Sequence, residues 1–565
     1  MEELFLKQIE FSSSDEFRKN YEVIVPDNFN FSYDVLDVLA QKTPDARALV
    51  WCNDDGEQYT FTFSEMKKYS DMTASFFMQK GIKKDDKVML ILKRRYEFWF
   101  AILALHKIGA VAIPATHMLT KDDLIYRNNA ASVTAVFAAY DEKVMANVEA
   151  SMSGSPTLKT LISTCGIEGL YSGSYYAKKR DNWIDFYDGL KAAPAFPKLD
   201  RKKVNSNDDI MVLYFTSGTT NHPKMVAHDF TYPLGHIVTA KYWQCVTKGG
   251  LHLTVADTGW AKAIWGKLYG QWICECAVFV YDYSAKFKPV DLLVQIENHG
   301  ITSFCAPPTI YRYLIQEDMS KYNLSSLKDA CTAGEPLSDE VYNKFKAQTG
   351  LGLLEGFGQT ETTLSLLNFK GEKVKPGSIG KPAPFYKIAL LKDDMSECVD
   401  GEIGEITFPL SGGKFPGLFK EYYRDEEKTK AVMHDGYYFT GDTAWRDEDG
   451  FYWFVGRSDD VIKCSGYRIG TFEVESVLMQ HPAVVECAVT GAPDEVRGQV
   501  VKATIVLAAK YKPGSDELVK DIQRFVKEVT APYKYPRIVE FVDELPKTIS
   551  GKIKRRDIRA KEQNS

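Results

Sequence analysis

Apolar residues recur along this chain in two patterns, one typical of buried strands and one typical of helices. Helical spacing is clearest around the apolar stretch Phe98–Leu105. Continuous short apolar runs, which suit buried strands, occur at residues 88–92, 110–114, 211–215, 277–280 and 301–305. Strands that alternate with helices favour parallel sheets covered by helices. The pattern therefore predicts layered α/β subdomains over about residues 30–205 and 206–370.

The pattern changes twice in the second half of the chain. Glycines and β-formers crowd together between about residues 371 and 456, which predicts a small β-barrel-like unit. A helix is expected to begin at Ser515, and residues 537–542 read as a strand. We therefore expect an α/β protein with a large N-terminal domain, a hinge and a small, mobile α+β C-terminal domain. The expected bounds are 1–456, 457–460 and 461–565.

Composition narrows the class of protein. The chain has 565 residues, of which 45% are hydrophobic and 26% charged, and its net charge is −6. This mild acidity argues against general binding to nucleic acid or to a membrane surface. The ten cysteines are scattered, which favours buried free thiols in a reducing compartment. No leader and no membrane-spanning run are evident, so we expect a cytoplasmic protein without membrane insertion. The oligomeric state is left open.

Residues 214–224 form the most informative segment of the chain. An apolar run leads into small and hydroxyl-bearing residues, and then into Pro223 and Lys224. Short side chains let backbone N–H groups approach a ligand, and a nearby cation suits a polyphosphate. A flexible polar linker is the alternative, but linkers seldom follow a buried strand. The spacing fits neither a Walker loop nor a Gly-x-Gly-x-x-Gly dinucleotide loop.

Thr-Ser-Gly-Thr-Thr followed by Pro-Lys resembles the phosphate loop of the adenylate-forming superfamily, which includes acyl-CoA synthetases, peptide-synthetase adenylation domains and firefly luciferases. One position departs from that family, which usually has glycine where this chain has Asn221. Asn is one of the few other residues that tolerate a positive φ. The resemblance implies that ATP phosphates bind to Thr216, Ser217, Gly218, Thr219, Thr220 and Lys224.

A second motif of the same superfamily begins at Gly356. The string Gly-Phe-Gly-Gln-Thr-Glu leaves an aromatic face open for a purine, and it ends in a hydroxyl and a carboxylate. A carboxylate such as Glu361 is a suitable Mg²⁺ ligand beside phosphate oxygens. By resemblance, further ATP and Mg²⁺ contacts come from Gly334, Glu335, Pro336, Glu355, Gly356, Phe357, Gly358, Gln359, Thr360 and Glu361.

A third motif ends at Asp442. A carboxylate can accept hydrogen bonds from both hydroxyls of a ribose, although an Asp after Gly can equally cap a turn. The aromatic-x-Thr-Gly-Asp pattern resembles the family's ribose-binding motif. Arg457 matches the arginine that also reaches the ribose, and Asp459 matches the hinge position.

Two segments of the C-terminal domain complete the resemblance. The basic cluster after residue 551 would suggest a localisation signal or a nucleic-acid patch if it were read alone. Its Pro-Lys-Thr-x-Ser-Gly-Lys context instead resembles the family's closing loop, in which Lys552 neutralises the reacting carboxylate and α-phosphate. Arg468 is expected to face the phosphate. The resemblance implies CoA contacts at Ser465, Gly466, Tyr467, Arg497 and Lys527.

Together these motifs imply a two-step ligation in which an acid is adenylated by Mg-ATP and then transferred to CoA. The chain is most similar to medium-chain acyl-CoA synthetases. Trp260 and Trp265 are expected to line the acyl and pantetheine channels, with Lys262 among them. Gly358 stands where acetyl-CoA synthetases have a pocket-shortening Trp, so acids larger than acetate are expected. A carrier-protein ligase acting in trans and a luciferase-like monooxygenase remain alternatives.

Overall fold

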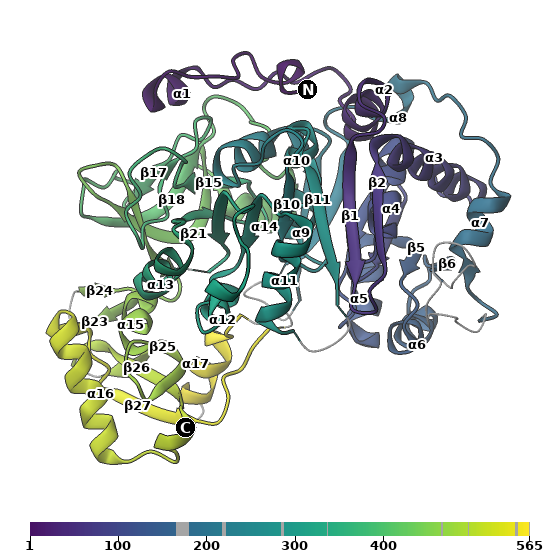
Figure 1. The fold of residues 1–565 in the computed structure, drawn as a ribbon. Helices are drawn as coiled ribbons and strands as arrows, with labels where there is room; N and C mark the ends of the chain where they lie inside the picture. Colours follow the sequence, from purple (N-terminus) through teal and green to yellow (C-terminus); the bar gives the residue numbers. More distant parts are fainter. Residues whose placement is uncertain are drawn as a thin grey trace.

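The computed structural model describes residues 1–164, 180–216, 222–283, 287–335, 337–464, 467–494, 496–548 and 552–563. In these ranges one sheet has nine strands (Figure 1), in the order β16 (Lys381–Pro382), β15 (Leu364–Leu367), β14 (Leu353–Gly358), β13 (Asp329–Ala333), β12 (Ser303–Ala306), β10 (Leu251–Thr254), β11 (Ala277–Asp282), β1 (Arg47–Asn53) and β2 (Gln58–Thr62). The strands from β14 to β1 pair in parallel, whereas β2, β15 and β16 are antiparallel to their neighbours.

A second sheet has eight strands within the described residues. Their order is β19 (Glu421–Tyr422), β9 (Lys224–Asp229), β8 (Ile210–Thr216), β4 (Val111–Pro114), β3 (Lys87–Ile91), β5 (Val133–Ala138), β6 (Thr160–Ser163) and β7 (Ile184–Asp185). The strands expected from the apolar runs are confirmed as β3, β4, β8, β11 and β12.

The predicted subdomain boundary near residue 205 is wrong for both sheets. β1 and β2 belong to the nine-stranded sheet, where they lie beside β11, although they precede residue 205 (Figure 1). β8 and β9 follow residue 205 but complete the eight-stranded sheet. A strand buried on both faces carries little information about its partner, so the sequence pattern could not assign these strands.

Helices separate and cover the two sheets. The layer between the sheets contains α3 (Phe63–Gln79) and α4 (Glu97–Ile108), and every residue of α4 is buried. A helix that is apolar all round must be covered on all sides, which explains this position. The outer faces are covered by α11 (Pro289–His299), α12 (Pro308–Leu314) and α13 (Asp339–Thr349) on the first sheet, and by α5 (Lys121–Ala131) and α6 (Glu142–Ser151) on the second.

The smaller β unit and the region after residue 460 each have a sheet of five strands in the described ranges. The first contains β17 (Ala389–Leu391), β18 (Ile403–Pro409), β20 (Met433–His434), β21 (Tyr437–Arg446) and β22 (Tyr452–Arg457). The second contains β23 (Ile462–Cys464), β24 (Tyr467–Ile469), β25 (Val484–Asp494), β26 (Gly498–Leu507) and β27 (Ile538–Val542). α15 (Thr471–Leu478), α16 (Asp516–Val529) and α17 (Arg555–Gln563) pack on the latter.

The remaining helices are short. They are α1 (Ser14–Asn20), α2 (Val38–Lys42), α7 (Phe186–Ala192), α8 (Arg201–Val204), α9 (Ala261–Gly266), α10 (Tyr269–Ile273) and α14 (Glu426–Val432). Two further helical segments, η4 (Tyr232–His236) and the π-helical η5 (Thr239–Trp243), pack against α10 between the sheets.

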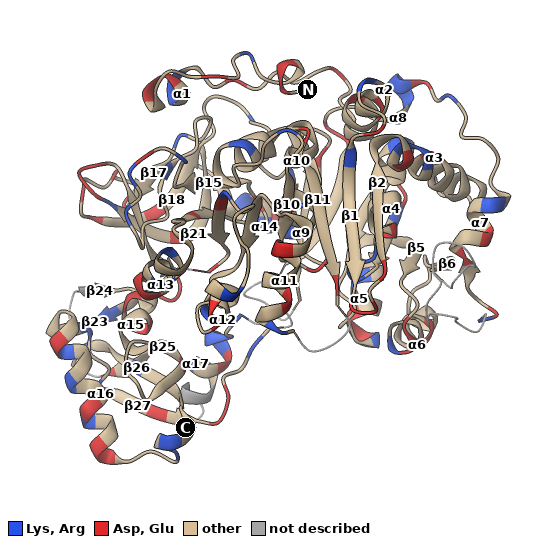
Figure 2. Ribbon diagram, in the orientation of Figure 1, with Lys and Arg blue, Asp and Glu red and all other residues tan. Residues whose placement is uncertain are grey.

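Three properties of the whole chain bear on the sequence predictions. Among the described helices, none is long and apolar enough to cross a bilayer. The nine described cysteines are free and buried, as predicted. Acidic and basic residues are interspersed along α16 and across the other helices in view (Figure 2).

Candidate functional site

The β8–β9 hairpin holds the two ends of the predicted phosphate loop together. Thr216 and Lys224 are paired across the hairpin, while Ser217, Gly218, Thr219 and Thr220 lie outside the described residues. The ammonium group of Lys224 donates a hydrogen bond to the Tyr422 hydroxyl at 3.3 Å and lies 4.6 Å from the centre of its ring. Burial lowers the pKa of Lys224.

Tyr422 joins this hairpin to the second motif. Its hydroxyl donates to the Glu361 carboxylate at 2.8 Å, so Lys224 and Glu361 meet at one hydroxyl group. The position of Tyr422 follows from β19, which pairs with β9 opposite Val226. Thr360 directly precedes Glu361, and its backbone carbonyl accepts a hydrogen bond from the buried ring of His228 at 2.7 Å. Burial lowers the pKa of His228 to about 4, so the ring is neutral at neutral pH.

Asp442 is the centre of a second polar cluster. It lies on β21 and is 6% exposed. Its carboxylate accepts hydrogen bonds from the side-chain amide of Gln359 and, at 3.4 Å, from Arg457. Burial raises the pKa of Asp442, and the charge of Arg457 and the Gln359 bond act against that rise. Gln359 in turn accepts from Tyr438 at 2.7 Å. The arrangement presents a buried, hydrogen-bonded carboxylate beside a cation.

The predicted adenine-binding segments lie at the ends of neighbouring strands. Phe357 is the half-buried last residue but one of β14, and its ring centre lies 5.9 Å from that of Phe454. Gly334 follows the adjacent β13 with φ +106°, and the Glu335 carboxylate accepts from Thr309 at 2.6 Å. Pro336 lies outside the described residues.

Glu355 differs from the other predicted nucleotide contacts because its side chain is buried. It is 3% exposed and accepts the backbone N–H of Leu337 at 3.1 Å. Burial raises the pKa of Glu355 to about 8. Its carboxyl group therefore holds the backbone at Leu337, just after the predicted adenine-binding segment.

Lys552 comes close to the same cluster from the C-terminal part of the chain. Its positive charge is one of the influences that lower the pKa of Asp442. The closing segment is held by Thr548, whose N–H donates to the Lys552 carbonyl at 2.8 Å. In this conformation the charge of Lys552 thus acts on Asp442. Asp459, the predicted hinge residue, lies 3.7 Å from Arg457.

Two of the predicted CoA residues, Arg497 and Lys527, can be placed in the C-terminal domain. Arg497 directly precedes Gly498, which is paired with Cys464. Ser465 and Gly466 are outside the described residues, as are the side chains of Tyr467 and Arg468 on β24. Arg497 lies 3.9 Å from Asp494, and the Lys527 ammonium group lies 3.9 Å from the centre of the Tyr535 ring.

The predicted acyl-channel residues cluster around α9. Trp260 precedes this helix, and Trp265 stacks on the ring of His236. Lys262 is half-buried and donates to the Ala333 carbonyl at 3.1 Å. A Cβ at Gly358 would lie 2.5 Å from the Thr363 carbonyl oxygen, which gives this glycine a packing role besides the predicted one.

Sequence reasoning missed several residues that hold this site together. They act through long-range contacts that no short motif contains, and they are His228, Glu405, Tyr422 and Phe454.

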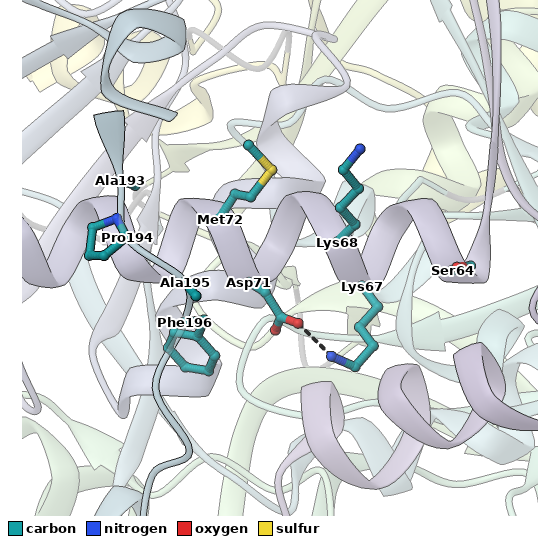
Figure 3. A pocket seen from close by; sticks show the side chains of 9 residues that line it. All are labelled: Ser64, Lys67, Lys68, Asp71, Met72, Ala193, Pro194, Ala195 and Phe196. Carbon is teal, nitrogen blue, oxygen red and sulfur yellow. Dashed lines mark hydrogen bonds and ion pairs between the residues drawn. The ribbon is translucent and has the colours of Figure 1, made fainter. Parts of the chain in front are cut away.

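A hollow of about 430 Å³ lies away from this site, between α3 and residues 193–196 (Figure 3). There Lys67 is paired with Asp71 at 2.5 Å, so this cation is already neutralised.

Family models match most of the chain. A model described as "AMP-binding enzyme" matches residues 36–423, and one described as "AMP-binding enzyme C-terminal domain" matches residues 473–552. The chain belongs to the AMP-binding enzyme family. The predicted membership of the adenylate-forming superfamily is thereby confirmed.

Named relatives and a solved structure agree with this assignment. The chain is 39% identical over 561 residues to the acyl-coenzyme A synthetase ACSM3, mitochondrial, of Pongo abelii, covering 98% of this chain and 93% of the relative. It is 40% identical over 546 residues to the acyl-coenzyme A synthetase ACSM4, mitochondrial, of Rattus norvegicus, and the match covers 95% of this chain and 91% of the relative.

The fold resembles that of the anthranilate CoA ligase AuaEII, crystallised with anthranoyl-AMP. The TM-score is 0.83 at 27% identity, and the match covers 96% of this chain and 98% of that one. The predicted fold class is therefore confirmed.

Proposed function

We propose that this chain is an AMP-forming acyl-CoA synthetase that activates a medium-chain, short branched or small aromatic carboxylic acid. One observation carries the proposal. One hydrogen-bonded chain runs from Lys224 through Tyr422 to Glu361. Another runs from Gln359 through Asp442 to Arg457. The two chains are joined by the consecutive motif residues 359–361. The likeness to acyl-coenzyme A synthetases over nearly the full length supports the same reaction.

In the first proposed step, an oxygen of the acid attacks the α-phosphorus of ATP, and the bond to pyrophosphate breaks. Phe357 and residues 334–336 hold the adenine, and Asp442 with Arg457 binds the ribose. The 216–224 segment holds the phosphates. Lys552 and Thr360 balance the charge that develops around the reacting centre, so that positioning and electrostatics do the catalytic work.

Glu361 is a suitable residue to hold Mg²⁺ against the ATP phosphates. Within the described residues no group of three or more carboxylate, His or Cys side chains could hold a metal ion by itself. A single carboxylate fits Mg²⁺, which keeps water ligands and binds largely through the nucleotide. When bound, the ion withdraws negative charge from the phosphate oxygens.

In the second proposed step, the CoA thiol attacks the acyl carbonyl and AMP leaves. The path of the thiol runs along Ser465, Gly466 and Tyr467, and Arg497 with Lys527 binds the CoA phosphates. We propose that residues 461–565 rotate about Asp459 between the two steps, so that this segment replaces Lys552 at the reacting centre while Arg468 turns to face phosphate.

The choice of acid follows from the residues around α9. A glycine at position 358 leaves room for acids larger than acetate, while Trp260, Trp265 and Lys262 limit the length of the pocket. The anthranilate named for the structural relative supports an aromatic acid of small size.

The cellular location stays a prediction. The residues argue for a cytoplasmic enzyme, whereas the named relatives are mitochondrial. Fractionation of the source cells would decide between the two.

AMP release dependent on both CoA and acid, measured across a panel of carboxylic acids, tests the proposal. A medium-chain, branched or small aromatic acid should give the highest kcat/KM, with acyl-CoA identified by mass. The highest value for acetate would contradict the Gly358 argument. Acid-dependent pyrophosphate release without any acyl-CoA would favour a carrier-protein ligase instead. Light emission with oxygen uptake would favour the monooxygenase.

A further inference from the structure

Tyr422 is held firmly in place by its backbone and by its ring. It is paired with Val226 across the β19–β9 ladder, and its N–H donates to the Thr429 hydroxyl at 3.0 Å. Tyr422 is 3% exposed, and the centre of its ring lies 5.0 Å from that of Phe419. Strand pairing and burial of the ring therefore fix the place of the Tyr422 hydroxyl.

The segment that contains Tyr422 holds Glu361 at two points. The Phe419 N–H donates to the Glu361 backbone carbonyl at 2.7 Å, and the Tyr422 hydroxyl donates to the Glu361 carboxylate at 2.8 Å. Both donors come from residues 419–422. The backbone and the side chain of Glu361 are therefore oriented together by one short segment that lies outside the nucleotide motifs.

The hydroxyl of Tyr422 also contacts the cation of the phosphate segment. It accepts from the Lys224 ammonium group at 3.3 Å, and that group lies 4.6 Å from the ring centre. A phenol can donate one hydrogen bond and accept others, so the two contacts can exist together. Burial lowers the pKa of Lys224, and the negative charge of Glu361 acts against that fall, so the two charges are near each other.

The two charged groups meet through this hydroxyl. Opposite charges attract each other strongly where burial reduces screening by water. In the described part of the chain, however, no direct ion pair joins Lys224 to Glu361, and the Tyr422 hydroxyl bridges them instead. A direct pair would neutralise both groups and would compete with any phosphate or metal ion that binds there.

We propose that Tyr422 is a positioning residue that keeps Lys224 and Glu361 apart, so that the ammonium group stays available to the ATP phosphates and the carboxylate to Mg²⁺. This inference rests on the function proposed above. Without the hydroxyl, the two groups form a direct ion pair, which Mg·ATP must break in order to bind. Hydrogen bonds to charged groups are among the stronger ones, so we expect the loss to cost about tenfold in affinity.

Tyr422→Phe tests the inference, because it removes the hydroxyl and keeps the buried ring with its contacts to Lys224 and Phe419. Titration calorimetry in the absence of acid compares the binding of Mg·ATP with that of AMP. We expect the Kd of Mg·ATP to rise about tenfold and the Kd of AMP, which lacks the β- and γ-phosphates, to stay within about twofold. Tyr423→Phe, at the next and half-buried position, is the matched control and should change neither value.

A double-mutant cycle tests the physical cause. ATP binding is measured in EDTA, where no metal ion contributes. Tyr422→Phe should weaken this binding about tenfold, because Glu361 then pairs with Lys224. When Tyr422→Phe is combined with Glu361→Gln, the lysine has no carboxylate to pair with. Binding should then return to the value of Glu361→Gln alone.

Unchanged Mg·ATP binding in Tyr422→Phe would overturn the inference. Equal losses for ATP and AMP would also overturn it, because they would show a general disturbance of the site. A loss that persists in the double variant would refute charge separation as the cause. If the wild-type protein binds neither ATP nor AMP, the proposed function fails, and the inference fails with it. Normal binding by the wild type and an unaffected Tyr422→Phe refute the inference alone.

Discussion

At the scale of single residues, Glu355 shows how burial changes the charge of a side chain. Its pKa rises from an ordinary value of 4.5 to about 8, because burial of the carboxyl outweighs the hydrogen bond from the Leu337 N–H, which lowers the pKa. The folded-state pKa lies above the unfolded one, so the favourable contribution is complete below about pH 4.5. It is lost progressively as the pH rises toward about 8.

Glu355→Gln should therefore remove part of the pH dependence of stability. The amide keeps an acceptor for Leu337 and does not ionise, so the variant should be more stable than wild type at pH 8.5, by on the order of a few kcal/mol. The two proteins should be closer at pH 5. Denaturant unfolding at both pH values measures the difference. Glu340→Gln, at an exposed site on α13, is the control, and parallel pH profiles for Glu355→Gln and wild type would refute the prediction.

Other residue-scale features were accessible from the sequence to different degrees. Lys224, Glu361 and Asp442 could be predicted because each stands within a short motif whose residue types suit phosphate, metal or ribose. Tyr422 could not be predicted, since nothing in its local sequence distinguishes it from other tyrosines. Its role depends on the pairing of β19 with β9, which brings its hydroxyl to both Lys224 and Glu361.

At the scale of elements, the β14–β15 hairpin controls the position of the adenine-binding motif. The strands approach each other so closely at Gly358 that a Cβ would lie 2.5 Å from the Thr363 carbonyl oxygen. Backbone atoms cannot move aside as a flexible side chain can, so any larger residue must shift the hairpin. The shift would reach Phe357 and Gln359 on either side.

Gly358→Ala should accordingly destabilise the protein by about 1–3 kcal/mol and raise the KM for ATP. Gly412→Ala provides the control, because a Cβ there meets nothing within 4 Å, and it should change stability by less than about 0.5 kcal/mol. Thermal unfolding and steady-state kinetics measure both effects. Wild-type stability and ATP affinity in Gly358→Ala would show that the hairpin adapts without cost.

At the scale of the whole molecule, the proposed function makes the placement of the C-terminal domain decide which step can occur. In the conformation described here, the charge of Lys552 reaches Asp442. The predicted CoA residues instead cluster around the β25–β26 turn and Tyr535. Under the proposed function, this arrangement suits adenylation rather than thioester formation.

Lys552→Ala should therefore separate the two half-reactions. Adenylation, followed as acid-dependent pyrophosphate release, should fall about 100-fold or more, because a cation beside the developing charge is lost. Thioester formation from supplied acyl-adenylate should stay within about threefold of wild type. Lys554→Ala, two residues away and paired with Asp557, should affect neither step. Equal losses in both half-reactions would contradict the proposed domain exchange.

The sequence by itself determined the family and the order of its motifs, because phosphate, ribose and metal each require particular residue types within a few positions. It also determined several of the strands and helices, because their apolar patterns are local. The tertiary structure alone decided that β1 joins the nine-stranded sheet and β8 the eight-stranded one, and that Tyr422 links Lys224 to Glu361. These features depend on contacts between distant segments, and local patterns do not encode such contacts.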